Sequence, residues 1–387
     1  MFMLVQLKEL GTITTGNTPS KQNTDFYDSD DISFIKPDLL SDSEISLISY
    51  SNEFISEKAR SKARIADKDS IFVTCIGTIG KIGIASDGEY AFNQQINVIK
   101  VNDSIFPKYL AYALFHSKPR LIEIANAPVV PIINKTQFEK FTINVEMDKS
   151  KQREIITTLD KLQSIITHRT QQLEKLDELI KARFVEMFGE PILNSKEWKM
   201  ATIGDIVSEV KYGTSRPAVE GGKYAYLRMN NLTYDGYLDL TDLKRIDIPD
   251  NEIEKCIVRK GDVLFNRTNS VELVGKTCVF DEDEDMVIAG YIIRVRLKPV
   301  MLPLVLSCFM NTDALKAKLR DMAKGAVNQA NINAQELQSI KIYLPPLDLQ
   351  HQFVAFVDQI NKSKVAVQKA LDEAQLLFDS LMQEYFG

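Results

Sequence analysis

The chain contains Ile133-Asn134-x-x-x-Phe138-x-x-Phe141-x-Ile143-x-Val145 and repeats this pattern as Ile332-Asn333-x-x-x-Leu337-x-x-Ile340-x-Ile342-x-Leu344. A second pair of matching segments ends in Phe188-Gly189 and Phe386-Gly387, which lie 198 residues apart. Similarity at a fixed spacing is the sequence signature of a duplicated module. We therefore expect two diverged copies of one globular part, each followed by a long helix.

Each predicted globular part mixes strands and helices. Short runs rich in β-branched residues predict strands at 71–74, 96–101, 225–229, 263–265 and 292–297. Longer apolar segments predict helices at 108–115 and 312–323. The fold class is therefore expected to be α+β.

Two stripes of apolar residues with heptad spacing follow the globular parts. The first is Ile155, Leu159, Leu162, Ile166, Leu173, Leu176 and Ile180, and the second is Phe353, Val357, Ile360, Val367, Leu371, Ala374, Phe378, Leu381 and Tyr385. Adding 198 to the first stripe gives positions of the second, except that Ile166 corresponds to Lys364, the polar break in the second stripe, so both helices present the same face. A stripe this narrow predicts an antiparallel coiled coil. The alternative is two amphipathic helices that pack separately, each on its own domain.

The expected architecture is two pseudo-symmetric domains separated by this coiled coil. We expect a first domain at 1–147, a central helix at 148–193, a second domain at 194–345 and a C-terminal helix at 346–387. A helix from about Lys151 to Met187 would be roughly 55 Å long and would act as a spacer. The residues expected to pair the helices are Leu159, Leu162, Leu173, Leu176, Val357, Ile360, Leu371 and Phe378.

The composition limits the class of protein. The 387 residues are 44% hydrophobic and 26% charged, which indicates a globular chain of two or more domains. The chain has no apolar run long enough for a membrane span and no recognisable signal peptide, so we expect a cytoplasmic protein. Its four cysteines form no C-x-x-C pair and are expected to be reduced thiols.

The sequence contains no recognisable catalytic set. Ser270 to Thr277 resembles a phosphate-binding P-loop, but the first glycine is replaced by Ser270 and a strand, not a helix, is expected to follow. The three histidines are far apart in the sequence, which argues against a metal site or a catalytic triad. We therefore expect a non-catalytic chain that binds no cofactor or metal itself.

Several predicted loops combine side chains that can form bidentate hydrogen bonds with DNA bases. Lysines nearby could bind phosphates. The candidate DNA-binding residues are Lys36, Thr78, Lys81, Asn93, Gln94, Arg228, Arg267, Asn269 and Asn328, with Lys276 as a further candidate phosphate ligand. The alternative is that the asparagines only stabilise turns.

Charge gives weaker support to DNA binding. A net charge of −6 argues against non-specific binding to a polyanion but not against a specific DNA-binding protein. Arg294, Arg296 and Lys298 alternate along a predicted strand, so they are expected to share one basic face.

The order of several motifs resembles the specificity subunits of type I restriction-modification systems. The motifs are Leu10-Gly-x-Ile13-x-x-Gly16-x-Thr18-Pro19, Phe34-Ile-Lys-Pro-Asp-Leu39, Thr74-Cys-Ile-Gly-Thr-Ile-Gly-Lys81, Asn93-Gln-Gln95, Ala326-Val-Asn-Gln-Ala-Asn-Ile-Asn333 and Ile340-Lys-Ile-Tyr-Leu-Pro-Pro-Leu347 with Gln350. The resemblance extends over essentially the whole chain, including both repeats.

This resemblance implies a role and a set of partners. Each globular part would be a target recognition domain for one half of a split double-stranded DNA site. The helices would set the gap between half-sites and bind two modification subunits, which would carry S-adenosylmethionine and methylate adenine. Restriction subunits would add ATP- and Mg-dependent translocation and cleavage.

Two alternative functions remain open at this point. One is a helical scaffold whose globular ends bind proteins instead of DNA. The other is an enzyme in its own right, which the missing motifs argue against.

Overall fold

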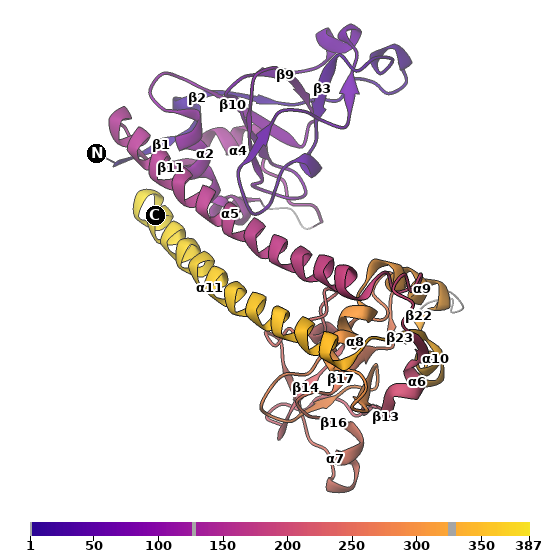
Figure 1. The fold of residues 1–387 in the computed structure, drawn as a ribbon. Helices are drawn as coiled ribbons and strands as arrows, with labels where there is room; N and C mark the ends of the chain where they lie inside the picture. Colours follow the sequence, from indigo (N-terminus) through magenta and orange to yellow (C-terminus); the bar gives the residue numbers. More distant parts are fainter. Residues whose placement is uncertain (1, 126–128, 324–329) are drawn as a thin grey trace. The chain divides into compact units, whose positions relative to one another are not determined.

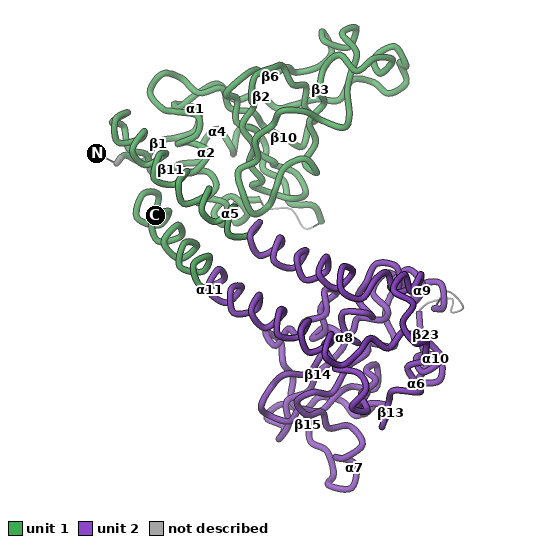
Figure 2. The backbone as a smooth tube through the Cα atoms, viewed as in Figure 1, with its two compact units in different colours: residues 1–170, 369–387 green, residues 171–368 purple. Residues whose placement is uncertain are grey.

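The computed structural model describes residues 2–125, 129–323 and 330–387. The chain forms two compact units, shown in Figures 1 and 2. Unit 1 comprises residues 1–170 and 369–387, and unit 2 comprises residues 171–368. The two long helices, α5 (Lys149–Phe188) and α11 (Leu347–Phe386), each contribute one half to each unit. This division differs from the four expected segments because the ends of both long helices pack into the globular cores.

Unit 1 contains three sheets with the strand orders β1-β11, β2-β10-β7-β8-β4 and β5-β3-β9-β6. Its elements besides the long helices are β1 (Phe2–Gln6), α1 (Leu7–Leu10), β2 (Gly11–Thr15), η1 (Thr24–Phe26), β3 (Ile32–Ile35), η2 (Pro37–Leu39), β4 (Ser46–Ile48), β5 (Phe54–Ile55), η3 (Glu57–Lys62), β6 (Ile65–Asp67), β7 (Ile71–Thr74), β8 (Ile82–Ala85), β9 (Glu89–Phe92), β10 (Ile96–Val101), α2 (Pro107–His116), α3 (Lys118–Ile124), α4 (Lys135–Lys140) and β11 (Thr142–Glu146).

Unit 2 contains four sheets with the orders β12-β23, β13-β21-β17-β19, β15-β14-β20-β16 and β18-β22. Its elements besides the long helices are β12 (Lys199–Thr202), α6 (Ile203–Ile206), β13 (Val207–Tyr212), β14 (Tyr224–Leu227), η4 (Met229–Asn231), β15 (Lys244–Ile246), α7 (Asp250–Cys256), β16 (Ile257–Val258), β17 (Val263–Asn266), β18 (Thr268–Asn269), β19 (Thr277–Val279), β20 (Met286–Ile288), β21 (Ile292–Leu297), α8 (Pro303–Met310), α9 (Asp313–Ala323), β22 (Ala330–Asn331), α10 (Ala334–Ser339) and β23 (Lys341–Leu344).

The two units share one topology. The order β2-β10-β7-β8 in unit 1 matches β13-β21-β17-β19 in unit 2, and β5-β3-β9-β6 matches β15-β14-β20-β16. In both second sheets the central strand pair, β3 with β9 or β14 with β20, is parallel. The duplication predicted from the sequence is therefore confirmed at the level of strand order.

The repeated Ile-Asn pattern encodes a matching helix start in each unit. Asn134 accepts a hydrogen bond from the backbone N–H of Gln137, and Asn333 accepts one from Glu336, which gives α4 and α10 the same capping box. The apolar residue four positions after each asparagine is buried, at Phe138 and Leu337. The pattern therefore specifies both where the helix begins and which face it buries.

In each unit one half of each long helix joins the core. In unit 1, Leu159 and Leu162 of α5 share a buried cluster with Phe378 of α11. In unit 2, Val357 of α11 shares a buried cluster with Phe184 of α5.

Within unit 2 the two helix segments run antiparallel. Asp177 forms an ion pair with Lys364, and Phe184 and Phe188 further along α5 pack against Phe353, which lies earlier in α11.

Each residue predicted to pair the helices is buried or half-buried. Leu159, Leu162, Val357 and Phe378 are buried, and Leu173, Leu176, Ile360 and Leu371 are half-buried. In the described part of the chain, no helix is both long and apolar enough to cross a membrane.

Candidate nucleic-acid interface

In unit 1 three loops meet at one end of the β2-β10-β7-β8-β4 sheet. The loop after β2 is held by a hydrogen bond from the Gly16 N–H to the carbonyl of Ile96 at 3.0 Å. The β7–β8 hairpin is held by a bond from the Cys75 N–H to the carbonyl of Gln95 at 2.7 Å. These bonds bring the segments 16–18, 75–81 and 93–95 together.

Unit 2 repeats this loop cluster with different side chains. The Gly213 N–H donates to the carbonyl of Ile292 at 3.1 Å, and the Arg267 N–H donates to the carbonyl of Tyr291 at 2.9 Å. Arg267 therefore occupies the place that Cys75 occupies in unit 1. The same backbone frame thus presents a cation in one unit and a buried thiol in the other.

Two glycines allow this close approach of the backbone. A Cβ atom on Gly16 would lie 2.2 Å from the carbonyl oxygen of Asn93, and one on Gly213 would lie 2.2 Å from the carbonyl oxygen of Ile288. No side chain fits at such a distance, so the loops depend on glycine at both positions.

The predicted site residues of unit 1 differ in their accessibility. Thr78 and Gln94 are exposed, and the Gln94 side-chain carbonyl accepts a hydrogen bond from the Thr18 hydroxyl at 2.7 Å. Asn93 is buried beneath them, where its side chain bonds both the backbone N–H and the side chain of Gln95. Gln94 and Thr78 are therefore accessible to solvent, whereas Asn93 shapes the turn.

The two predicted lysines of unit 1 lie behind these loops. Lys36 directly follows β3 and forms an ion pair with Glu53. The Lys81 ammonium donates to the carbonyl of Pro37 at 3.3 Å, which ties the β7–β8 hairpin to η2. Both lysines would have to exchange these partners to bind a phosphate.

Unit 2 has the same arrangement. Arg228 follows β14 and forms an ion pair with Asp242 at 2.7 Å, as Lys36 does with Glu53. The Lys276 ammonium donates to the carbonyl of Met229 at 2.9 Å. Lys276 is only 7% exposed, and burial lowers its pKa, so its structural role is clearer than a role in phosphate binding.

Arg267 is half-buried and its side chain lies over an aromatic ring. Its guanidinium lies 4.9 Å from the centre of the Tyr212 ring, and its Nε has no hydrogen-bond partner among the described residues. Asn269 is half-buried and accepts a hydrogen bond from the N–H of Ser270 at 2.9 Å. Asn328 lies outside the described residues.

The basic face expected at Arg294, Arg296 and Lys298 is wrong. Arg294 is fully buried and pairs with Glu209, and Arg296 pairs with Asp262 at 2.9 Å. Arg294 is therefore unavailable for a basic surface, whereas Arg296 is half-buried and Lys298, just beyond β21, is exposed.

Sequence reasoning missed three residues of the loop clusters. Tyr212 supports the Arg267 guanidinium, Thr18 bonds Gln94, and Tyr291 is 48% exposed beside Arg267. Aligning Gly16 with Gly213 would have drawn attention to Tyr212 and Thr18, because both lie within two residues of these glycines. No comparable signal marks Tyr291.

The cysteines are free thiols, as expected. Cys75, Cys256 and Cys278 are buried and Cys308 is half-buried. Burial raises the pKa of Cys75 and of Cys278 to about 12, which keeps both thiols protonated and unreactive near neutral pH.

Comparisons with known proteins agree with this duplicated architecture. The family model described as "Type I restriction modification DNA specificity domain" matches residues 2–177 and 195–374. The chain is 22% identical over 272 residues to the type I restriction enzyme EcoKI specificity subunit of Escherichia coli K12, covering 69% of this chain and 57% of the relative. It is 38% identical over 109 residues to the HindI specificity subunit of Haemophilus influenzae, covering 28% and 23% respectively.

The chain spans about half the length of the curated relatives it matches, with 46% and 57% of two relatives covered. Among solved structures, an S subunit of a type I restriction-modification system from M. genitalium has a TM-score of 0.59 at 15% identity. That match covers 100% of this chain and 96% of the other. At this identity the structural likeness shows the fold alone.

Proposed function

Because the chain belongs to the family of type I restriction modification DNA specificity domains, we propose that it is the DNA-recognition subunit of a type I restriction-modification complex. In this role it recognises a two-part DNA sequence and directs adenine methylation and restriction by partner subunits. Since DNA is the proposed target, we place the protein in the cytoplasm.

The observation that carries this proposal is the loop cluster present once in each unit. The backbone frame is the same in both, whereas the side chains differ, with the exposed Gln94 in unit 1 and the half-buried Arg267 in unit 2. A glutamine amide suits adenine and an arginine fork suits guanine in the major groove. Two such clusters would therefore recognise two different half-sites.

We also propose that α5 and α11 form an antiparallel coiled coil between two target recognition domains. The antiparallel segments in unit 2 and the shielded heptad stripes support this arrangement. The coiled coil would then set the gap between half-sites.

The catalytic work belongs to other subunits in this proposal. Two modification subunits would bind S-adenosylmethionine, and restriction subunits would use ATP and Mg. This chain would position them on DNA without contributing a catalytic group. The competing function, a scaffold that binds only proteins, has no specific observation in its favour.

The proposal can be tested with the chain co-expressed with the modification subunits of its host. Genomic adenine methylation should reveal a motif with two specified parts separated by an unspecified gap. Gel-shift titrations with that motif should show affinity that falls steeply with salt, because phosphate contacts release counterions.

The Arg267→Ala variant locates the recognition within unit 2. If Arg267 binds guanine, this change should weaken binding to the cognate DNA site by ~1–3 kcal/mol. It should relax sequence specificity in one half of the motif only. Arg259→Ala is the control, because Arg259 lies in the same unit but is occupied by Glu254 and Asp285. A complex without DNA affinity would favour the scaffold instead.

A further inference from the structure

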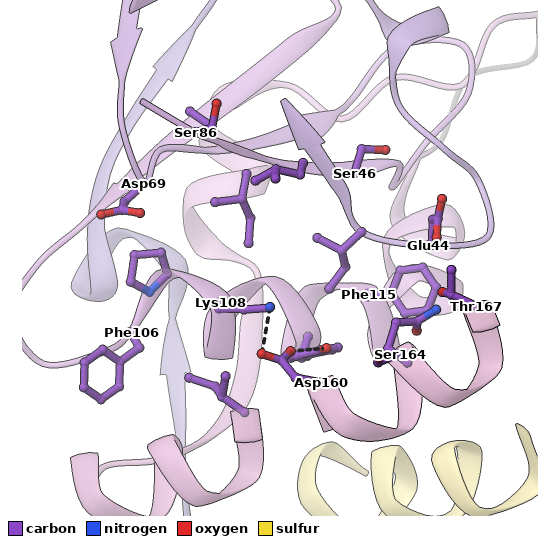
Figure 3. Close-up of a pocket in the computed structure, with 18 of the residues that line it drawn as sticks. Glu44, Ser46, Asp69, Ser86, Phe106, Lys108, Phe115, Asp160, Ser164 and Thr167 are labelled. Atoms are coloured by element: carbon purple, nitrogen blue, oxygen red, sulfur yellow. Dashed lines mark hydrogen bonds and ion pairs between the residues drawn. The ribbon is translucent and has the colours of Figure 1, made fainter. Parts of the chain in front are cut away.

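Unit 1 has an open groove of about 810 Å³ between its sheet and its helices (Figure 3). The segment that carries Glu44 and Ser46 forms one wall, and Lys108 of α2 with Asp160 and Ser164 of α5 forms the other. The lining is mostly apolar and includes residues such as Ile45, Phe106, Phe115 and Ile156. A volume of this size falls in the range of ligand-binding pockets.

The corresponding groove of unit 2 is smaller, at about 210 Å³. The two grooves use matching helix positions: Lys108 and Phe115 line the first, and Leu304 and Asn311, each 196 residues later, line the second.

Tyr237 lines the groove of unit 2 and reaches both long helices. Its hydroxyl donates to Asp177 at 2.6 Å, and the Lys364 ammonium lies 4.4 Å from the centre of its ring.

Ile45 is the unit 1 counterpart of Tyr237. Each residue lies five positions after a buried leucine, Leu40 or Leu232. In both loops a lysine bonds the backbone between these two positions. Lys118 of α3 donates to the carbonyl of Asp42, and Lys316 of α9 donates to that of Tyr234. The loops are therefore equivalent, and unit 1 has the smaller isoleucine side chain where unit 2 has the tyrosine ring.

The open groove also has the charges to hold an aromatic side chain with basic neighbours. Lys108, which forms an ion pair with Asp160 at 2.8 Å, offers the cation that Lys364 offers to Tyr237. Glu44 and Asp69 lie at the groove without an ion-pair partner among the described residues, so they add negative charge to it.

We propose that the unit 1 groove binds an aromatic side chain, flanked by basic residues, from a partner protein. The ring occupies in unit 1 the place that Tyr237 occupies in unit 2, and the flanking cations meet Glu44 and Asp69. In unit 2 the aromatic ring comes from within the unit, whereas in unit 1 a partner protein supplies it on assembly. This inference does not depend on DNA recognition.

Methyl NMR of the full-length chain with labelled isoleucines tests the proposal. The probe is the peptide acetyl-Lys-Tyr-Lys-amide, with acetyl-Lys-Ala-Lys-amide and acetyl-Glu-Tyr-Glu-amide as comparisons. The basic tyrosine peptide should produce saturable shifts at Ile45, Ile84 and Ile156, which line the groove. The other two peptides should bind about tenfold more weakly, the effect of one lost aromatic or charge contact.

Two variants make the test specific. Ile45→Tyr should fill the groove, as Tyr237 does in unit 2, and remove the shifts, with folding checked by the methyl spectrum elsewhere. Tyr237→Ala should open the second groove and add a new saturable shift at Ile180, which lines it. Equal binding of the alanine peptide, full binding by folded Ile45→Tyr, or no new site in Tyr237→Ala would each overturn the proposal.

Discussion

Gln152 and Gln350 lie 198 residues apart and make the same hydrogen bonds at the start of the two long helices. The Oε1 of Gln152 accepts from the N–H of Phe106 at 3.0 Å, and that of Gln350 accepts from the N–H of Leu302 at 2.8 Å. Both side chains are fully buried. Each glutamine therefore joins its long helix to the first turn of α2 or α8.

The amide nitrogens complete the match. The Nε2 of Gln152 donates to the carbonyls of Ser104 and Glu146, and the Nε2 of Gln350 donates to those of Val300 and Pro345. Three backbone groups in each unit thus depend on one side chain.

Replacing Gln350 by leucine should destabilise unit 2 by ~3 kcal/mol, because it leaves buried backbone groups without partners. Gln152→Leu should do the same to unit 1. Urea unfolding followed by probes in each unit would measure both effects. Gln171→Leu, at an exposed position of α5, should change stability by less than ~0.5 kcal/mol. A loss at Gln350 no larger than at Gln171 would contradict the anchoring role.

The close loop contacts predict a second effect. Gly213→Ala should displace the loop after β13 and lower the stability of the folded protein by ~1–3 kcal/mol, because the added Cβ would overlap the carbonyl of Ile288. Gly16→Ala should have the same effect in unit 1.

Thermal unfolding and motif-specific DNA binding would measure these glycine variants. The matched control is Gly290→Ala in the same loop cluster, where the nearest atom to a new Cβ is 3.4 Å away. A tolerated Gly213→Ala would show that the loop can move without cost.

Tyr212 should matter for DNA recognition although it was not predicted from the sequence. Tyr212→Leu removes the ring beneath Arg267 while keeping every charge, so it should weaken cognate binding by ~0.5–1 kcal/mol. Tyr212→Phe keeps the ring but loses the hydrogen bond from the N–H of Ala334 to the hydroxyl. If stacking positions Arg267, the phenylalanine variant should bind DNA better than the leucine variant. Equal losses would assign Tyr212 to loop stability instead.

The fold was more predictable from the sequence than the candidate site. The strands at 71–74, 96–101 and 292–297 were predicted with the bounds the structure has, because short runs rich in β-branched residues favour strands. The repeat predicted the shared topology before any strand pairing was known.

The side-chain roles were less predictable because they depend on contacts distant in sequence. Lys81 and Lys276 look like phosphate ligands in isolation, yet each bonds a carbonyl of a remote 3₁₀ turn. The alternation around Arg294 correctly indicates a strand. It does not indicate that Arg294 pairs with Glu209 from a neighbouring strand. A single sequence contains no direct signal for such pairings.

Because of Lys316, the stability of unit 2 should change with pH in the alkaline range. Its side chain is 5% exposed, donates to the carbonyl of Tyr234 and lies over the Tyr234 ring. Burial lowers the pKa of Lys316 to about 8, with Lys181 and Arg320 acting in the same direction and Asp235 and Asp313 opposing them. The charged form is therefore disfavoured in the folded protein.

The sign of the pH effect follows from proton binding. Between the folded pKa of about 8 and the unfolded value near 10.4, the unfolded chain binds the proton more tightly, so raising the pH favours folding. Relative to Lys316→Met, the wild-type chain should gain on the order of 2 kcal/mol between pH 7 and pH 10. Urea unfolding of both chains across this range would measure the difference between their free energies of unfolding. Groups that titrate alike in both chains do not contribute to this difference. Lys318→Met, on the same helix, is the matched control. Parallel pH profiles for wild type and Lys316→Met would show that the ammonium stays charged in the folded unit.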